Sequence, residues 1–413
     1  MEQSKLGNDN MNDLIDTDLS DPEHFRSGPP FEVFSALRER DPVHLNPVGF
    51  VGESFWSLTR WEDCAMASKD TDTFSSTGGS TIPGTAALGD LQKLMMVSQD
   101  PPHHTARRAI VHKVFTPRTV IGQTAAITAV LNGLLDRVQE RGRCDLVADV
   151  TAPYPLLVIA EMLGVPGEDQ HDLLRWSNAI GQLQGSEDSA GELMTAMNEM
   201  RAYLVAFIAS GRADPKDDLI SKLIHAEVDG QRLTDNELLV SFAELMVAGN
   251  ETVRTTLAAA IWLLLEHPSE FELLREDPSL TGNAVEEVLR YWTPNVYQAR
   301  TVTKDVTIGQ RTLRGGERIA MWLCSANRDP EIHADPDRFD IRRKDPRHMS
   351  FGGGGRHFCL GAGLARLELG IGLPILIERL RGLRFDGDPS IIPHTFFHAV
   401  GSVPIVYEPV RVA

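Results

Sequence analysis

The sequence is poor in cysteine and lacks any long apolar run. Its 413 residues include four cysteines, and no two of them stand in a CxxC pair. Because structural zinc sites and disulfide frameworks need cysteines at suitable spacings, neither is expected, and a reducing compartment is favoured. No run of about eighteen apolar residues occurs, so we expect no helix that spans a membrane.

Nothing in the sequence marks a boundary between domains either. No linker rich in Pro, Gly or Ser divides the chain, and no internal repeat or low-complexity tract is present. We therefore expect one domain over residues 31–413, preceded by a polar, acidic extension over residues 1–30. That extension has no apolar stretch of the kind found in secretory signals, which predicts a cytoplasmic protein. The net charge of −18 argues against nucleic acid as the main partner.

Helical periodicity covers most of the sequence. The predicted elements are a helix at 31–40, helices over 103–292, strands at 43–45, at 55–59 and within 296–320, a hairpin over 396–407, and a loop over 75–89. The loop is predicted from its content of Gly, Ser, Thr and Pro. The expected fold class is mainly α with a small β portion.

The most informative segment runs from Phe351 to Glu368. It contains four consecutive glycines, then Cys359, then an apolar pattern that predicts a helix. Four glycines favour a tight loop over a helix or strand interior. Cys359 is therefore expected at a helix N-terminus, where free amides and the helix dipole stabilise a thiolate. Such a thiolate is a nucleophile or a metal ligand. A nucleophile needs a base, for which only His357 is close in sequence, whereas one axial sulfur beside a flat cofactor fits haem iron.

The same segment resembles the haem-binding loop of the cytochrome P450 superfamily, the haem-thiolate monooxygenases. Gly355, His357 and Gly361 fall where the family has a glycine, a basic residue and a glycine. Phe351 stands eight residues before Cys359, with one glycine more than the usual family loop. The resemblance implies that Cys359 binds the iron of haem b and that Gly361 contacts the cofactor. It also implies a single P450-type fold, with the haem between a long central helix and the helix after the cysteine.

A second motif lies in the middle of the longest predicted helix. This helix begins with a capping box at residues 234–237, and its apolar pattern ends at Leu265. Residues 248–252, Ala-Gly-Asn-Glu-Thr, include poor helix formers and predict a local widening. An acid beside a hydroxyl in an apolar helix is costly unless it has a role. The run resembles the acid–threonine pair of the family, which implies that Glu251 and Thr252 are catalytic and deliver protons to dioxygen.

A third motif is a pair of opposite charges. Glu287 and Arg290 stand three residues apart, so they are neighbours on a helix surface. They resemble the ExxR motif of the family, and residues 336–339, Pro-Asp-Arg-Phe, resemble the segment that provides its third member. The resemblance implies a buried structural network of Glu287, Arg290 and Arg338 behind the cysteine loop.

Cationic side chains recur where the family binds the haem propionates. His104 and Arg108 are four residues apart and share a helix face. Two donors on one face suit a carboxylate or a phosphate. By resemblance, His104, Arg108, Arg300 and His357 are expected to bind the propionates.

The resemblance also implies an apolar substrate cavity above the haem. Its expected walls are Leu94, Met95, Met96, Val97, Leu245, Ala248, Val296, Phe396 and Phe397. These side chains predict a hydrophobic small molecule. The extended cysteine loop and the run at 248–252 resemble those of enzymes that oxidise sterols, terpenoids and branched lipids, so a substrate of this class is favoured.

The implied reaction is monooxygenation with dioxygen and two electrons. No GxGxxG follows a predicted strand and no flavin domain is present, so the electrons are expected from an acidic ferredoxin with an NAD(P)H-dependent reductase. Two basic islands on this acidic chain predict the docking surface. They are Arg107, Arg108, Lys113 and Arg118, and Arg342, Arg343, Lys344 and Arg347.

Three other functions stay open from the sequence. A peroxide-driven peroxygenase would dispense with the proton delivery assigned to Glu251 and Thr252. A non-catalytic haem-thiolate sensor or carrier would not need that pair, and a haem-free helical scaffold would purify as a colourless protein. Glycines at 181, 185 and 191 permit residues 170–210 to open as a lid without showing that they do.

Overall fold

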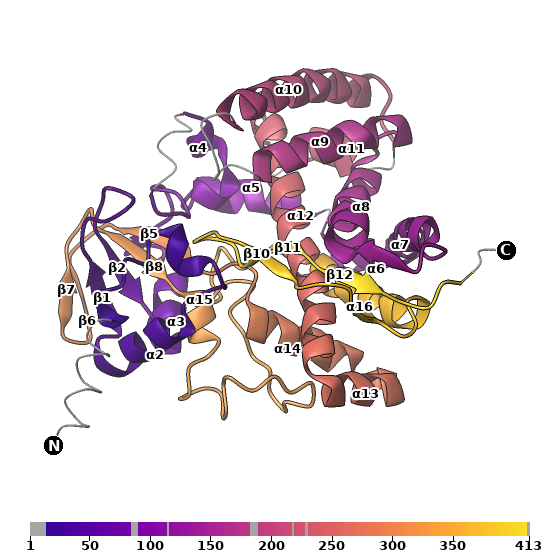
Figure 1. The fold of residues 1–413 in the computed structure, drawn as a ribbon. Helices are drawn as coiled ribbons and strands as arrows, with labels where there is room; N and C mark the ends of the chain where they lie inside the picture. The colour runs from indigo at the N-terminus through magenta and orange to yellow at the C-terminus, as the bar shows by residue number, and fades with distance from the viewer. Residues whose placement is uncertain are drawn as a thin grey trace.

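The computed structural model describes residues 14–83, 90–113, 115–181, 189–216, 219–227 and 230–410. Parts of the predicted N-terminal extension, of the loop over 75–89 and of the possible lid over 170–210 lie outside these residues. Helices fill most of the described chain and strands form small sheets beside them (Figure 1), which confirms the predicted fold class. Within the described ranges, no helix is both long enough and apolar enough to cross a membrane.

Helices surround one long central helix. In chain order they are η1 (Pro22–Phe25), α2 (Phe31–Arg40), α3 (Trp61–Lys69), α4 (Asp90–Leu94), η3 (Met96–Ser98), α5 (His103–His112), α6 (Pro117–Gly122), α7 (Thr124–Val138), η4 (Val147–Thr151), α8 (Pro153–Leu163), η5 (Gly167–Asp169), α9 (Gln170–Gly181), α10 (Ser189–Ala213), α11 (Leu219–His225), α12 (Asp235–Glu266), α13 (Pro268–Glu276), η6 (Pro278–Leu280), α14 (Thr281–Trp292), α15 (Leu323–Ala326) and α16 (Ala362–Arg379). The predicted helix at 31–40 is confirmed as α2.

Strands form a five-stranded sheet and three smaller ones. In chain order they are β1 (Val43–Asn46), β2 (Phe55–Leu58), β3 (Phe74–Ser75), β4 (Arg143–Asp145), β5 (Gln298–Val302), β6 (Val306–Ile308), β7 (Arg311–Leu313), β8 (Arg318–Met321), β9 (Arg384–Phe385), β10 (Ser390–Ile392), β11 (Ala399–Ser402) and β12 (Pro404–Val406). The largest sheet has the order β1-β2-β8-β5-β3, and its β2–β8 pair is parallel. The other sheets are β10-β11, β4-β12-β9 and β6-β7.

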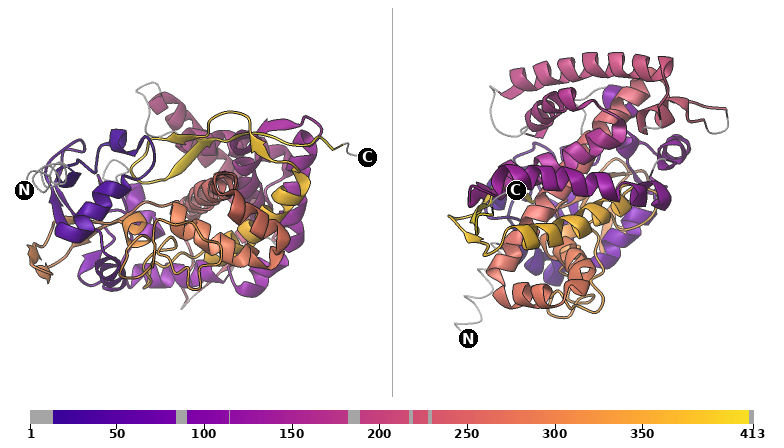
Figure 2. Two further views of the ribbon diagram at one scale, coloured as in Figure 1. Left: turned by 60° about the horizontal axis from the view of Figure 1, so that its bottom comes forward. Right: turned by 90° about the vertical axis from the view of Figure 1, so that its right-hand side faces the viewer.

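The central helix α12 begins and ends where the sequence predicts. The Thr234 side chain accepts a hydrogen bond from the Glu237 amide and the Glu237 carboxylate accepts one from the Thr234 amide, so the capping box is present. The helix ends at Glu266, just before Pro268, which begins α13. Figures 1 and 2 show α12 running through the middle of the molecule, and α8, α14 and α16 pack against it.

The run at 248–252 does not interrupt this helix. The α-helix is continuous through these residues, where the sequence predicts a local widening. A Cβ atom at Gly249 would lie 3.2 Å from the Cδ1 atom of Ile159 on α8. The absence of a side chain at this position therefore lets α8 and α12 approach closely, and the glycine has a packing role.

The expected boundary at residue 30 is wrong. Leu19 and Phe25 are buried, and the Phe25 ring stacks on that of Trp322 with centroids 6.2 Å apart. Both residues belong to an apolar cluster that includes Phe34 of α2. Within the described part of the chain, residues before position 30 are therefore packed into the same fold and do not form a separate extension.

The predicted C-terminal hairpin is also wrong. Both of its strands exist, but β11 pairs with β10, whereas β12 pairs with β4 and β9. Only Val403, which is buried, separates the two strands. A single residue cannot form the two-residue turn of a tight hairpin. The chain therefore passes from one sheet into another at Val403.

Candidate active site

The cysteine loop is shaped by its contact with α3. A Cβ atom at Gly353 would lie 2.5 Å from the Ser68 hydroxyl oxygen, and one at Gly355 would lie 2.6 Å from the Ser68 carbonyl oxygen. Gly355 also has a φ of +77°, which side chains disfavour. The glycines are therefore required by the helix beside the loop as well as by its tight path. The Cys359 amide closes the loop by donating to the Phe351 carbonyl at 2.8 Å.

Cys359 is the exposed cysteine among the four, all of which lie in described residues. Burial raises the pKa of the Cys324 thiol to about 12 and that of the Cys144 thiol likewise to about 12, and it raises the pKa of Cys64 well above its ordinary value. Those three thiols therefore stay protonated at neutral pH, which makes them poor nucleophiles and metal ligands.

The surroundings of Cys359 act on its thiol in two directions. Desolvation by the surrounding protein raises the pKa of the thiol, although the residue is exposed at the surface. The amides of Gly361 and Ala362 and the charges of Arg108 and Arg366 act against this shift. Gly361 is the N-cap of α16, and nothing lies within 4 Å of a Cβ placed on it. The thiol thus has amide donors behind it and free space beside Gly361.

The four predicted propionate-binding residues come together. The rings of His104 and His357 lie 4.1 Å apart between centroids, although the residues are far apart in sequence. Burial, followed by the charges of Arg108, Arg356 and Arg300, lowers the pKa of His104 to about 4. Burial and the charge of Arg300 lower the pKa of His357 to about 3. Burial likewise lowers the pKa of Arg300 to about 10.

This cluster has cationic groups in excess of acids. The Nδ1 atom of His104 is buried and finds no hydrogen-bond partner within the described part of the chain. Asp100 is the nearby acid, but its carboxylate already accepts hydrogen bonds from the Ser76 amide and the Ser75 hydroxyl. An anion bound among these residues would satisfy His104 and return the depressed pKa values towards ordinary ones. The residues present therefore fit the carboxylates of a haem.

The charged network behind the loop is present, with one member different from the prediction. Glu287 and Arg290 are fully buried and joined by hydrogen bonds of 2.7 and 2.8 Å. Arg338 is not the third member: its side chain is 58% exposed and faces Asp340. Its place is taken by Arg343, whose side chain is 12% exposed and whose Nε donates to Glu287 at 3.1 Å. Arg338 contributes only its carbonyl oxygen, which accepts from Arg290.

Asn327 connects this network to the cysteine loop. Its carbonyl accepts from Arg290, its side-chain oxygen accepts from the Met349 amide at 2.6 Å, and its Nδ2 donates to the Ser350 hydroxyl at 3.0 Å. The Ser350 hydroxyl in turn donates to the Leu289 carbonyl on α14. Asn327 therefore fixes the start of the loop.

The acid–threonine pair on α12 borders open space but has local partners. The Thr252 hydroxyl donates to the Ala248 carbonyl at 3.0 Å. The Glu251 carboxylate lies 3.3 Å from Arg254, and both side chains are largely buried. Ala248 is exposed although it lies in the middle of a helix that crosses the molecule. Sequence reasoning missed Arg254, which follows Glu251 by three residues and is thus a neighbour on the helix.

All of the predicted pocket residues except one are at least partly exposed. Leu94, Met95, Met96, Val97, Leu245, Phe396 and Phe397 are half-buried, and Ala248 is exposed. Val296 has 0% exposure and belongs to an apolar cluster with Phe34 and Trp322. Its assignment to the pocket wall is wrong, because the side chain presents no surface to any open space.

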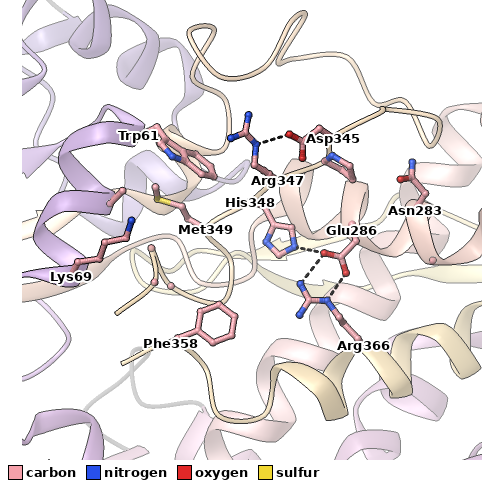
Figure 3. Close-up of a pocket in the computed structure, with 16 residues that line it drawn as sticks. Trp61, Lys69, Asn283, Glu286, Asp345, Arg347, His348, Met349, Phe358 and Arg366 are labelled. Atoms are coloured by element: carbon pink, nitrogen blue, oxygen red, sulfur yellow. Dashed lines mark hydrogen bonds and ion pairs between the residues drawn. The ribbon is translucent and has the colours of Figure 1, made fainter. Parts of the chain in front are cut away.

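A pocket of about 610 Å³ lies beside the cysteine loop (Figure 3). It is lined by α3, α14, the glycines of the loop and residues 345–349. Arg366 donates twice to Glu286, at 2.6 and 2.9 Å, and His348 lies 3.1 Å from the same carboxylate. Burial alone would raise the pKa of Glu286, but these hydrogen bonds outweigh it and lower the pKa to about 2.

The two predicted basic islands are only partly on the surface. Arg107 is 3% exposed, and Arg343 is held by Glu287, so neither is available to a partner. The Arg108 guanidinium donates to the Phe358 carbonyl of the cysteine loop at 2.6 Å. The exposed members are Lys113, Arg118, Arg342, Lys344 and Arg347. Lys69, Arg356 and Arg366, which sequence reasoning did not include, are exposed on or beside the loop.

Comparison with known proteins identifies similar sequences and structures. The family model described as Cytochrome P450 matches residues 187–402. A steroid C26-monooxygenase of Mycobacterium tuberculosis is 36% identical over 405 residues, which cover 97% of this chain and 99% of that protein. A methyl-branched lipid omega-hydroxylase of the same species is 34% identical over 390 residues, covering 91% and 90%.

Solved structures agree with the sequence relatives. The structure of P450BioI in complex with hexadec-9Z-enoic acid ligated acyl carrier protein superposes with a TM-score of 0.84 at 32% identity. The match covers 92% of this chain and 98% of the P450BioI chain.

Proposed function

Because the chain belongs to the cytochrome P450 family, whose members bind haem through a cysteine thiolate, we propose that Cys359 is the residue that binds the iron of its haem b. The chain is a monooxygenase of this family. The observation that carries the assignment is the exposure of Cys359, beside Gly361, at the start of α16. The other three cysteines are wholly or partly buried.

The residues around the cofactor have separate tasks. When bound, the haem supplies the redox centre at which dioxygen is activated. Amides of Gly361 and Ala362 stabilise the Cys359 thiolate, and His104, Arg108, Arg300 and His357 hold the propionates. Arg300 is buried and Arg108 is half-buried, so two carboxylates would compensate charges that are otherwise desolvated. The carboxylates would also raise the pKa values of His104 and His357, which burial and nearby arginines lower to about 4 and about 3.

Glu251 and Thr252 are the proposed route for protons. The Thr252 hydroxyl holds a proton that it donates to the Ala248 carbonyl, next to the open space at Ala248. Glu251 lies at the neighbouring position of the helix, and its carboxylate is 3.3 Å from the Arg254 guanidinium. This arrangement favours the dioxygen-dependent reaction over a peroxide-driven one or a sensor, because neither of those needs a hydroxyl and an acid at this place.

The proposed substrate is a steroid or a methyl-branched lipid. The relatives that carry these names cover nearly the whole chain. The half-buried side chains at residues 94–97, Leu245, Phe396 and Phe397 offer mostly apolar surface of the kind that binds such molecules.

The proposed electron donor is an acidic ferredoxin in the cytoplasm that docks at the pocket shown in Figure 3. Lys69, Arg347 and Arg366 line this pocket, and Lys344 is exposed beside it. Arg347 is paired with Asp345 and Arg366 with Glu286, so these four cations outnumber the two acids. On a chain with a net charge of −18, a local group of cations steers an acidic partner to the side of the molecule that carries Cys359.

The test is an optical titration of the purified ferric protein with steroids, methyl-branched lipids and an acyl chain linked to a carrier protein. A saturable change from low-spin to high-spin in the Soret band with steroids or branched lipids is the expected result. A response only to the carrier-linked chain would overturn the proposed substrate. Cys359→Ser should abolish the thiolate-type spectrum and Cys144→Ser should keep it. A Cys359→Ser protein with an unchanged spectrum would overturn the assignment of the ligand.

A further inference from the structure

A buried ion pair joins α5 to the central helix. The Nη2 atom of Arg107 donates to the Ser241 hydroxyl at 2.8 Å and to the Glu237 carbonyl at 3.1 Å, and it lies 3.5 Å from the Glu244 carboxylate. The Nε and Nη1 atoms of Arg107 are buried and have no hydrogen-bond partner among the residues that the structure describes. Unused donors in a buried guanidinium are costly. The pair is therefore incomplete in the observed conformation.

The Glu244 carboxylate is shared between Arg107 and the backbone of the predicted pocket wall. Its other oxygen accepts from the Val97 amide at 3.2 Å. Burial raises the pKa of Glu244, while Arg107 and the amides of Met96 and Val97 act to lower it. The Glu244 side chain on α12 thus interacts with both α5 and η3, which a short loop separates in the sequence.

Glu244 lies on the same face of α12 as the residues that border open space. Glu244, Ala248 and Thr252 are spaced by four residues, which places them in one row along a helix. At 1.5 Å per residue, each step of four residues advances about 6 Å along the axis. The backbone at Met96 and Val97 is therefore fastened to α12 about two turns from Thr252.

We propose that Glu244 is a positioning residue that holds the segment Leu94–Ser98 against α12 and so sets one wall of the substrate pocket. The two unused donors of Arg107 provide the alternative partner. When the segment moves away, the carboxylate can turn to Arg107 and form the paired contact that guanidinium and carboxylate favour. The segment is thus released without leaving a buried carboxylate unpaired. The role of the segment Leu94–Ser98 as a pocket wall rests on the proposed function. Its attachment to α12 through Glu244 does not.

Hydrogen exchange at the Met96 and Val97 amides tests the attachment in the whole protein. Glu244→Ala should speed exchange at these amides about tenfold, because it removes a hydrogen bond to a charged acceptor. Glu244→Gln should give a smaller increase, since its amide oxygen can still accept from Val97. The control is Glu266→Gln on the same helix, whose carboxylate accepts from Trp262 Nε1 and which should leave both amides unchanged. Unchanged exchange in Glu244→Ala would overturn the proposal.

The haem-loaded enzyme separates positioning from general destabilisation. Glu244→Ala should raise KM and the rate of substrate dissociation about tenfold with little change in kcat, and Glu244→Gln should restore much of the difference. Equal losses in kcat and kcat/KM, without rescue by Gln, would overturn the positioning role. If exchange responds as expected but no steroid or lipid binds even to the wild type, the proposed substrate fails and the attachment stands.

Discussion

The Nε atom of Arg343 donates to the Glu287 carboxylate at 3.1 Å, while the guanidinium of Arg338, five residues earlier, faces solvent. Glu287 also accepts two hydrogen bonds from Arg290, so one buried carboxylate is shared by two guanidinium groups. Arg343 further donates to the carbonyls of Ala334, Asp335 and Arg338. It therefore holds together the irregular segment that carries Arg338.

Arg343→Ala and Arg338→Ala should differ sharply in stability. Loss of Arg343 should lower the free energy of unfolding by about 2 kcal/mol or more, because it removes charged hydrogen bonds to a buried acid. Loss of Arg338 should cost under about 0.5 kcal/mol, as is usual for exposed side chains. Urea unfolding of the two haem-loaded variants measures the difference. Equal costs would show that the network does not depend on Arg343.

This contrast shows what the sequence could predict and what it could not. The types of residue in the Pro-Asp-Arg-Phe segment indicate which part of the chain approaches Glu287. They do not indicate which arginine turns inward, since that depends on the path of the backbone through residues 338–343. The signal that could have found Arg343 is the second arginine of Asp340-Ile-Arg-Arg343.

Sequence signals that act over a few residues predicted helix ends correctly. The capping box and Pro268 gave the bounds of α12, because both act within a few residues. The prediction of a C-terminal hairpin was wrong because strand pairing is not local. Alternation predicts two strands, but their partners β10, β4 and β9 are determined by the packing of the whole fold. The prediction that Val296 lines the pocket was wrong for the same reason, since its position after α14 does not determine which face of the chain is buried.

Thr252→Ala should separate oxygen consumption from product formation. The hydroxyl lost is the one that donates to the Ala248 carbonyl beside the open space. General acid–base groups contribute about a hundredfold or more in rate, so product formed per NAD(P)H should fall at least about tenfold while peroxide rises. Substrate affinity should stay close to that of the wild type. Thr252→Ser, which keeps a hydroxyl, is the control and should retain most of the coupling. Tight coupling in Thr252→Ala would contradict the assignment.

Charge reversal at the pocket beside the cysteine loop should slow reduction by an acidic ferredoxin. Lys344→Glu and Arg347→Glu change exposed cations at this site. Each should lower the rate about tenfold at low ionic strength, and the effect should shrink as salt screens it. Stopped-flow reduction of the haem measures the rate. The matched control is Arg201→Glu on α10, an exposed cation at the far end of the molecule (Figure 1). An equal loss in this control would indicate a general effect of net charge.

His398 should make the stability of the protein depend on pH. Its ring stacks on that of Trp292 with centroids 3.9 Å apart, and its Nδ1 lies 2.7 Å from the Trp292 carbonyl oxygen. Burial, together with the charge of Arg328, lowers the pKa of His398 from 6.5 to about 3. Because the folded pKa lies below the unfolded one, the unfolded chain binds the extra proton. The contribution of His398 is therefore complete above pH 6.5 and is lost as the pH falls towards 3.

The measurement is the free energy of unfolding in urea at about pH 7 and about pH 5, for the wild type and for His398→Gln. The cost of the substitution should shrink by up to about 2 kcal/mol at the lower pH, because only the wild type must release a proton from this site to fold. The control is His171→Gln, a substitution of an exposed histidine, which should have the same free energy of unfolding as the wild type at both pH values. If the cost of His398→Gln is the same at both values, the histidine is not held neutral by burial, and its contact with Trp292 is then a packing interaction without a linked proton.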